Sequence, residues 1–409
     1  MPQPIEWSLM RLGEVTRPTK TWNPRSEPRE TIRYVDVSAI SREELRVLNA
    51  PFIPAATAPS RARKIVRTGD TVFATVRPTL KRIAQIPASF DREIVSTAFC
   101  VLRPDRAKVN PEFLFFAVQQ EPLMAEIAAL ETGASYPAVR DSDVLNQLIP
   151  VPSLWEQQSI AAVLSAIRAA LLHEAECEAV SVALKQTAMR ELFTRGLRGE
   201  AQKETEVGPM PESWDLTPCE QIFKLTSGKT RPSDLADTQT EDRPFPVLGG
   251  NGVMGFSHRC YVDAPRTLII GRVGEYCGAV HTASGKIWIT DNALYAKEWL
   301  SPHADLEFVA TFLEYFDLNR FKRMAGQPLV TQGMISEQRI PLPLTVDEQL
   351  EITSIFSAID RKIELHGNKR AVLDKLFKSL LHKLMIGEIR VADLDLSALA
   401  PTRVAEAAQ

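Results

Sequence analysis

The chain of 409 residues has little cysteine and no long apolar run. Its five cysteines are an odd number without a C-x-x-C pair, which argues against a disulfide framework and against a zinc site. No apolar stretch approaches the roughly 18 to 20 residues of a membrane span, and the first residues lack the basic and apolar regions of a signal peptide. We therefore expect reduced thiols in a cytoplasmic protein that does not enter a membrane.

The chain also lacks an excess of positive charge, since 48 Lys and Arg are set against 51 Asp and Glu. This excludes a protein that is basic over its whole surface. The net charge is +3 for residues 1–147, −2 for 150–206, −4 for 208–337 and 0 for 338–409. Any face that binds a polyanion must therefore be a local patch.

No assembled catalytic constellation is present in the sequence. The six histidines form no H-E-x-x-H cluster, and neither a G-x-S-x-G elbow nor a Walker lysine occurs. G-x-G-x-x-G at residues 250–255 matches the dinucleotide fingerprint, but the residues after it read as strand or turn instead of a helix. N-P-E-F at 110–113 departs from the Asn-Pro-Pro-aromatic motif of adenine methyltransferases, and no glycine-rich cofactor loop precedes it. We expect no catalytic residue, no metal ligand and no cofactor in this chain.

What the chain does contain is a repeated helix start. I-P-x-P at 149–152 and at 340–343 each leads, through Glu-Gln at 156–157 and 348–349, into a long run with helical periodicity. An offset of 192 superposes the apolar positions of the two runs. A spacing this long is that of a duplicated half-protein and not of a solenoid.

The repeat also predicts the helix limits and the division of the chain. Both runs start with S/T-x-x-E, which predicts a capping box in which hydroxyl and carboxylate satisfy helix N–H groups. We predict helices over 153–195 and 345–387. The chain then divides into a first unit at 1–148, a central helical region at 149–206, a second unit at 207–338, a C-terminal helical region at 339–391 and a flexible tail at 392–409.

The two long helices are expected to pair antiparallel. Their seams, taken at spacings of four and three, are apolar at the ends and polar in the middle. The second unit leaves the end of the first helix and returns to the start of the second, and these ends are neighbours only in an antiparallel pair. Pairing about midpoints near 175 and 367 places Glu174, Glu176 and Glu178 beside His366, Lys369 and Arg370. Scattered solvated charges are the alternative interpretation.

Outside the helices the pattern predicts short mixed elements. Residues 32–37, 71–76, 267–270 and 286–290 read as strands from their alternation and β-branched content, and 111–129 read as one helix with proline in its first turn. Residues 200–206 read as a polar linker. Residues 59–82 carry seven cations against one acid. That cluster can set guanidinium groups against phosphates, and a solvated face is the alternative.

With its motifs in this order and duplicated, the chain resembles the specificity subunits of type I restriction-modification systems. The matching features are the two I-P-x-P and Glu-Gln motifs, Trp7 and Trp214, G-D-T-V-F-A at 69–74 with V-R-P at 76–78, and G-G-N-G-V-M-G-F at 249–256. The resemblance implies an α+β fold. Two mixed α/β target-recognition domains would be separated by two long helices packed as an antiparallel coiled coil, with a pseudo-twofold internal repeat.

The resemblance also implies a function. Each recognition domain would read half of a bipartite, asymmetric DNA site, while the helices fix the spacing and dock methyltransferase and restriction subunits. The chain itself would be non-catalytic, and its partners would be double-stranded DNA, two methyltransferase subunits and the restriction and translocase subunits. S-adenosylmethionine, ATP and Mg²⁺ are expected in those partners. A helix over 156–194 would span about 58 Å, which allows half-sites about one to one and a half turns apart.

Two other functions stay open, a self-sufficient DNA adenine methyltransferase and a duplicated coiled-coil scaffold that never binds DNA. Phosphate contacts are expected from basic clusters and base contacts from polar and aromatic loop residues. The candidates are Arg61, Arg63, Lys64, Arg77, Lys81, Arg82 and Tyr136 in the first unit and Lys229, Arg231, Asn251, Arg272, Arg320, Lys322 and Arg323 in the second. Gly133 precedes Ile149 by two residues more than Gly326 precedes Ile340, so the correspondence of the loops at 132–137 and 325–330 is in doubt.

Overall fold

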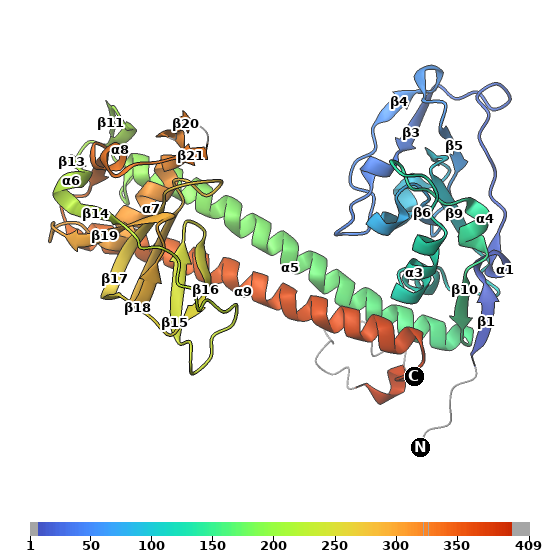
Figure 1. Ribbon diagram of the computed structural model, residues 1–409. Coiled ribbons are helices and arrows are strands. Elements are labelled where there is room, and N and C mark those ends of the chain that lie inside the picture. The colour runs from blue at the N-terminus through green and yellow to red at the C-terminus, as the bar shows by residue number, and fades with distance from the viewer. Residues whose placement is uncertain (1–6, 322, 326, 395–409) are drawn as a thin grey trace. The chain divides into compact units, whose positions relative to one another are not determined.

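Two long helices, α5 (Leu154–Arg195) and α9 (Val346–Met385), run through the structure, a computed structural model that describes residues 7–321, 323–325 and 327–394 (Figure 1). Both lie where the periodicity predicts them. The hydroxyl half of each capping box is formed: Ser153 Oγ accepts from the Glu156 N–H at 3.3 Å and Thr345 Oγ1 from the Glu348 N–H at 3.4 Å. The carboxylate half is not formed among the described residues, and Glu348 Oε1 instead accepts from Trp214 Nε1 at 3.4 Å.

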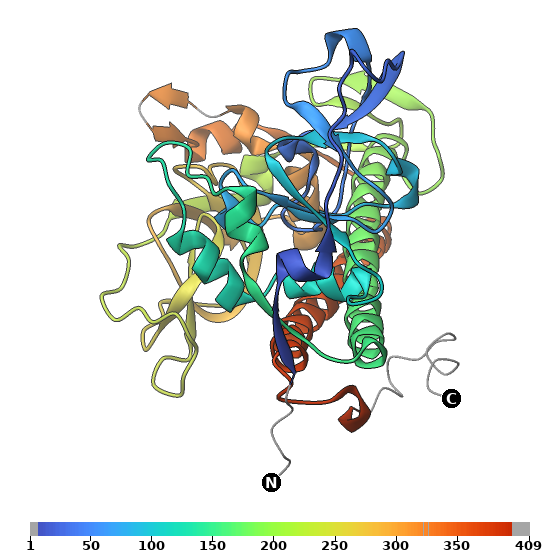
Figure 2. The same cartoon turned by 90° about the vertical axis from the view of Figure 1, so that its right-hand side faces the viewer.

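The described chain falls into two compact units whose boundaries cut both helices. Unit 1 holds the residues up to 176 and those from 367, and unit 2 holds 177–366. In unit 1 the start of α5, residues 160–167, shares a buried core with Leu380 and Leu384 near the end of α9. In unit 2 Phe193 near the end of α5 packs with Phe356 near the start of α9. The helices therefore pair antiparallel, as predicted, and lie side by side in both views (Figures 1 and 2).

The α/β part of unit 1 contains two four-stranded sheets. The first has the order β2-β9-β6-β7, formed by β2 (Thr16–Arg17), β9 (Phe99–Pro104), β6 (Thr71–Ala74) and β7 (Ile83–Gln85). The second has the order β4-β3-β8-β5, formed by β4 (Phe52–Pro54), β3 (Thr31–Val35), β8 (Ile94–Ser96) and β5 (Ala62–Ile65). A separate antiparallel pair, β1 (Ser8–Arg11) with β10 (Leu148–Val151), leads into α5. The strands predicted at 32–37 and 71–76 are thus confirmed, with earlier ends.

Short helices complete unit 1. They are α1 (Leu12–Val15), α2 (Pro111–Ala117), α3 (Glu121–Ala129), α4 (Asp141–Leu145) and the 3₁₀ turns η1 (Val37–Ala39), η2 (Ala55–Thr57), η3 (Pro78–Leu80), η4 (Ala88–Phe90) and η6 (Val391–Asp393). The single helix predicted over 111–129 is wrong, because α2 stops at Ala117 and Gln120, in extended backbone, caps α3. Pro122 explains the break: it lacks an N–H and is tolerated only in a first helical turn, where α3 places it.

Unit 2 is built on one six-stranded sheet of order β14-β19-β17-β18-β15-β16. Its strands are β14 (Phe223–Ser227), β15 (Phe245–Gly249), β16 (Gly252–Ser257), β17 (Val262–Gly271), β18 (Val280–Ile289) and β19 (Ala293–Trp299). The other elements are the pairs β11 (Gln202–Thr205) with β12 (Gly208–Pro211), β13 (Asp215–Pro218) with β22 (Arg339–Leu342), and β20 (Arg323–Ala325) with β21 (Gln327–Leu329), and the helices α6 (Cys219–Ile222), α7 (Leu306–Phe316), α8 (Gln332–Ser336) and η5 (Leu318–Phe321). The strands predicted at 267–270 and 286–290 are therefore confirmed, and both are longer than predicted.

The two units repeat one topology. In each, an opening strand pairs antiparallel with the strand that leads into a long helix, β1 with β10 and β13 with β22. The strand order β2-β9-β6-β7 in unit 1 recurs as β14-β19-β17-β18 in unit 2. The duplication inferred from two sequence motifs thus extends through the sheets of both units.

Two predicted irregular segments fare differently. The polar linker at 200–206 is wrong in part, because β11 forms a hairpin with β12, and Gly208, the first residue after the turn, has a φ of 110°. Charged side chains in that strand conceal its alternation. Most of the tail predicted at 392–409 lies outside the described residues. None of the helices in the described part of the chain combines the length and the apolar character that a membrane span needs.

Candidate nucleic-acid interface

In unit 1 an exposed arginine and an exposed tyrosine stack beyond the end of β6. Arg77 adopts a left-handed backbone with a φ of 49°, and its N–H donates to Pro137 O at 2.7 Å. Its guanidinium lies 4.9 Å from the ring centroid of Tyr136, and its Nη2 donates to Ser135 O at 3.2 Å. Tyr136 is 71% exposed. Together they present a cation and an aromatic face to solvent. A cation can bind a phosphate, and an aromatic face can contact an exposed base.

Unit 2 repeats the backbone of this loop. Gly274, with a φ of 82°, donates its N–H to Pro328 O at 3.0 Å, just as Arg77 donates to Pro137 O. Bridges between Val273 and Leu329 in unit 2 and between Val76 and Ala138 in unit 1 match in the same way. The two prolines therefore correspond, and the extra two residues of unit 1 lie before Pro137. This resolves the doubt about the loops, although Lys322 and the side chain of Arg323 lie outside the described part.

Several loops of unit 2 converge at the same end of its sheet. The Arg272 N–H donates to Asn292 O at 2.8 Å and the Lys229 N–H to Ile289 O at 2.9 Å, which joins the loops after β14, β17 and β18. The approach is so close that a Cβ on Gly228 would lie 2.1 Å from Thr290 O. Glycine is required there because any side chain would collide with backbone.

Three residues predicted from the sequence lie on these converging loops. Lys229 Nζ is 4.3 Å from the ring centroid of Tyr261, Arg272 Nη1 donates to Ser227 Oγ at 3.4 Å, and Asn251 is exposed in the turn between β15 and β16. Burial, with a smaller effect from the charge of Tyr295, raises the pKa of Tyr261 to about 12. Its hydroxyl therefore stays protonated and donates to Ile289 O at 2.6 Å. Since β16 already begins at Gly252, within the glycine motif, that motif does not open a helix that could hold a dinucleotide.

The remaining described candidates of unit 2 are Arg231 and Arg320. Arg231 is exposed two residues beyond Lys229. Arg320 is exposed on η5, where its guanidinium lies 4.6 Å from the ring centroid of Phe316. A Cβ on Gly278 would lie 2.6 Å from Asn319 N, so η5 rests against the loop that follows β17.

The basic cluster at 59–82 does not form one patch. Lys64 is paired with Asp141 and donates to Phe99 O, and Arg82 Nη1 donates to two carbonyls of the η1 region at 2.8 and 2.9 Å. Lys81 pairs with Glu121. The exposed Arg61 and half-buried Arg63 lie at β5 in the second sheet, whereas Arg77 follows β6 in the first. The structure therefore separates these residues, and engages two of them internally.

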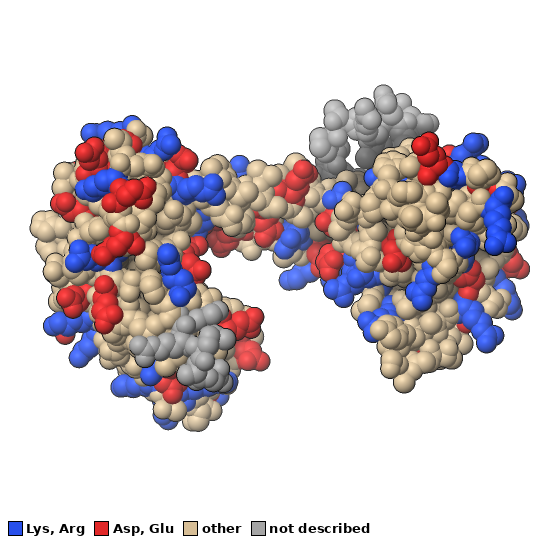
Figure 3. Space-filling model, turned by 90° about the horizontal axis from the view of Figure 1, so that it is seen from above, with Lys and Arg blue, Asp and Glu red and all other residues tan. Residues whose placement is uncertain are grey.

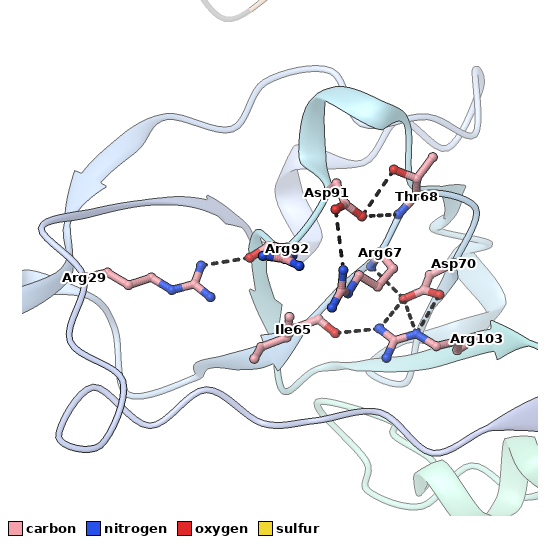
Figure 4. A network of polar contacts seen from close by, with 8 residues as sticks. All are labelled: Arg29, Ile65, Arg67, Thr68, Asp70, Asp91, Arg92 and Arg103. Carbon is pink, nitrogen blue, oxygen red and sulfur yellow. Dashed lines mark hydrogen bonds and ion pairs between the residues drawn. The ribbon is translucent and has the colours of Figure 1, made fainter.

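The one acidic residue of this region, Asp70, organises a turn. Asp70 is 1% exposed and receives Arg103 Nη2 at 2.8 Å, Arg103 Nε at 3.1 Å and the Arg67 N–H at 2.8 Å (Figure 4). Arg67 lies beside the exposed Asp91, with Nη1 3.7 Å from Oδ2. Burial raises the pKa of Asp70, and the hydrogen bond from Arg103 opposes that rise. On the face shown in Figure 3, cations and carboxylates are interspersed in both units.

The predicted charge pairing in the middle of the helices is present at one position. Lys369 Nζ lies 3.8 Å from Glu174 Oε1 in unit 1. The proposed pairing of Glu174 and Glu178 with His366 and Arg370 stays a prediction. Sequence reasoning missed Arg168, which is mostly buried under the unit 1 sheet domain, donates to Glu44 O and Leu45 O at 2.9 and 3.0 Å, and lies 4.7 Å from the Phe115 ring.

In unit 2 a lysine of α5 connects the helices to the sheet domain, as Arg168 does in unit 1. Lys185 Nζ lies 2.9 Å from Asp360 Oδ1 of α9 and 3.2 Å from Glu314 Oε1 of α7. Burial alone would lower the pKa of Lys185, but the hydrogen bond to Asp360 and the charge of Glu314 outweigh it, so the pKa is raised. Asp360 corresponds to Arg168 at the offset of 192. The contact between sheet domain and helices thus lies at equivalent positions in the two halves, but it uses hydrogen bonds to carbonyls in unit 1 and ion pairs in unit 2.

The glutamines of the repeated Glu-Gln motif have a structural role that the sequence did not reveal. Gln157 is fully buried: its Oε1 accepts the Asn110 N–H at 2.7 Å, and its Nε2 donates to Lys108 O at 3.1 Å and to Pro152 O at 2.9 Å. Asn110 caps α2 of the unit 1 sheet domain. The side-chain amide of Gln157 thus bonds α5 to the backbone at the start of α2 in that domain.

Gln349 makes the same set of contacts in unit 2. Its Oε1 accepts the N–H of Asp305, the residue that caps α7, at 2.7 Å. Its Nε2 donates to His303 O at 2.8 Å and lies 3.5 Å from Pro343 O, and it too is fully buried. The signal in the sequence was a polar pair repeated at the start of two apolar-faced helices.

No group of three His, Cys, Asp or Glu side chains within the described residues could hold a metal ion. Comparisons with known proteins identify relatives of the whole chain. The sequence profile described as "Type I restriction modification DNA specificity domain" matches residues 4–179 and 211–375. The "Putative type I restriction enzyme MjaX specificity subunit" of Methanocaldococcus jannaschii is 23% identical over 410 residues, 95% of each chain. The MjaVIII specificity subunit of the same organism is 24% identical and covers 74% of this chain and 76% of its own.

Solved structures resemble the chain over nearly its full length. A chain in a structure concerning complex assembly and conformational transition of the type I R-M system is 26% identical, with a TM-score of 0.55 and coverage of 94% of this chain and 99% of that one. The S subunit of a type I restriction-modification system from M. genitalium, 16% identical, has a TM-score of 0.66 with coverage of 94% and 97%. This second likeness shows the shared fold.

Proposed function

Because the chain belongs to the family of type I restriction-modification DNA specificity subunits, which are non-catalytic, we propose that each of its two recognition domains reads one half of a bipartite, asymmetric DNA site. One observation carries the proposal. The loop after β6 and the loop after β17 share a backbone, through Arg77 to Pro137 and Gly274 to Pro328, but carry different side chains. Two matching frames with different surfaces suit two different half-sites.

The contacts would divide between phosphates and bases. Exposed cations on the loops, Arg77 in unit 1 and Lys229 and Arg231 in unit 2, would bind phosphates. Tyr136 and Asn251 are exposed on turns and would reach base edges, since a carboxamide can bond an adenine in two places. Lys64 and Arg82 are bonded within the domain and would act by holding the loops.

The proposed protein partners follow from the same family membership. We propose recognition domains at 1–148 and 207–338 and helical regions at 149–206 and 339–391 that dock two methyltransferase subunits and the restriction subunits. Those partners would supply S-adenosylmethionine, ATP and Mg²⁺, and the complex would act on cytoplasmic DNA. The family match over both halves favours this function over a self-sufficient methyltransferase and over a scaffold that does not bind DNA.

Methylation mapping tests the proposed function. A host genome that carries the gene with its methyltransferase partner should show methylated adenines in a two-part motif with a fixed gap, and the motif should vanish on deletion of this gene. Replacing residues 1–147 with those of a relative should change one half of the motif and leave the other. A motif without a gap, or a change in both halves, would contradict the proposal.

Arg77 offers a residue-level prediction. Replacing Arg77 with glutamine removes one exposed guanidinium and should weaken binding of the methyltransferase complex to its target DNA about tenfold, the scale of one lost charged contact. The slope of log affinity against log salt should fall by about 1 if Arg77 contacts a phosphate. Arg67→Gln is the matched control, because Arg67 is exposed near the opposite end of β6 and faces Asp91. Equal DNA affinities of the Arg77→Gln and Arg67→Gln variants would show that Arg77 does not contact the DNA.

A further inference from the structure

Gln157 and Gln349 are the polar side chains through which each recognition domain is bonded to the start of its long helix. Each amide uses its oxygen for the N–H of the residue that caps the domain's helix and its nitrogen for a carbonyl two residues earlier. The same nitrogen also faces the proline carbonyl of the I-P-x-P segment. Three parts of the chain therefore meet at one side chain, namely the sheet domain, the proline that follows the connecting strand and the long helix.

Only an amide fits this arrangement. An ionised glutamate would keep the acceptor but could not donate to two carbonyls, and methionine would keep the shape but leave all three backbone groups without a partner. Burial makes the requirement strict, because water cannot replace the missing bonds at a residue with no exposed surface. A rotation of the domain about its helix would break several of these bonds together. The bonds therefore favour one orientation of the domain on the helix.

We infer that Gln157 and Gln349 are positioning residues that restrict the gap between the two half-sites to a single length. This deepens the proposed function and rests on it. A domain that can turn on its helix would present its loops over a wider range of positions along the duplex. Half-sites one base pair closer or farther apart would then be accepted. The base preferences of each half-site would stay the same, because neither glutamine is bonded to the loops proposed to carry them, and those loops keep their own backbone contacts.

The test uses the full chain in complex with its methyltransferase partner and a DNA panel with the mapped half-sites at the native gap and at one base pair less or more. Gln157→Met and Gln349→Met should each reduce the preference for the native gap at least tenfold, with half-site base preference unchanged. Ile160→Val, one turn farther along α5, and Thr353→Val, a buried hydroxyl that bonds within α9, are the controls. They should lower the melting temperature and keep the gap preference.

Other outcomes are equally informative. Folded methionine variants whose gap preference stays within twofold of the wild type would overturn the inference and leave the glutamines a purely structural role. If a methionine variant fails to assemble, Gln157→Glu and Gln349→Glu provide the same comparison, because they keep the acceptor and lose the donor. A wild-type complex that methylates at every gap length equally would instead refute the proposed bipartite reading itself.

Discussion

Replacing Arg103 with methionine is expected to lower the free energy of unfolding of unit 1 by about 3 to 5 kcal/mol at pH 7.5, since it leaves the carboxylate of Asp70 buried without its cation. Asp70 is 1% exposed and receives Arg103 through both Nε and Nη2. Urea unfolding followed by tryptophan fluorescence measures the change. The double variant Arg103→Met with Asp70→Asn should recover at least half of the loss, because a neutral amide needs no counter-charge.

The loss should shrink in acid, and the sign follows from Asp70. Burial raises the pKa of this carboxyl above its ordinary 3.8, against the opposing effect of Arg103. A carboxyl with a raised pKa in the folded state binds its proton more readily there, so its ionisation costs stability above that pKa, and the cost disappears as the pH falls through it. Without Arg103 the pKa rises further. The deficit of the variant should therefore be smaller at pH 5 than at pH 7.5.

Arg67→Met is the control for this prediction. Arg67 is exposed and its guanidinium lies 3.7 Å from the exposed Asp91, a surface pair worth about 0 to 1 kcal/mol. Its backbone N–H bond to Asp70 is kept in the variant. If Arg103→Met and Arg67→Met destabilise the protein equally, or if the loss does not depend on pH, Asp70 is not held as a buried carboxylate by Arg103.

Phe193→Ala is expected to be as severe in unit 2, with a loss of about 3 to 5 kcal/mol. The ring is 1% exposed and its centroid lies 5.3 to 5.6 Å from those of Phe308, Phe312 and Phe356. It joins α5 to α7 of the sheet domain and to α9, so its removal leaves a cavity where three helices meet. Thermal unfolding should show the change as a lower midpoint for unit 2.

Val180→Ala on the same helix is the comparison for Phe193. Val180 is 63% exposed, so its truncation should change stability by less than about 0.5 kcal/mol. A loss for Phe193→Ala close to that of Val180→Ala would mean that the aromatic cluster can close around the vacancy. The cavity argument would then not hold at this site.

The fold was predictable to the extent that its signals were periodic and local. Both long helices appear in the apolar spacing, and the offset between the Ile-Pro motifs revealed the duplication. The break at Pro122 could have been read from the proline, whereas the hairpin at β11 could not, because all four residues of that strand are polar and it has no apolar face. Helix pairing was predictable because chain connectivity allows only one direction.

The candidate site was less predictable because it is assembled by sheet topology. Seven cations within residues 59–82 looked like one cluster, but β5 and β6 belong to different sheets and separate Arg61 from Arg77. Short-range sequence also cannot tell an exposed cation from one such as Lys64, which is bonded to Asp141. In unit 2 Lys229, Asn251 and Arg272 were nominated separately, and close backbone approach at Gly228 and its neighbours helps bring their loops together.

The bonds of Gln157 and Gln349 have one property that concerns how such a protein can change. Every partner of these amides is a main-chain group, at Lys108, Asn110 and Pro152 in one half and at the corresponding positions in the other. Side chains on the recognition surface can therefore be replaced during evolution without loss of the hydrogen bonds that hold the domain on its helix. A new target sequence can be acquired by changing the loops alone, while the two glutamines of the helix pair keep their bonds to the same main-chain groups.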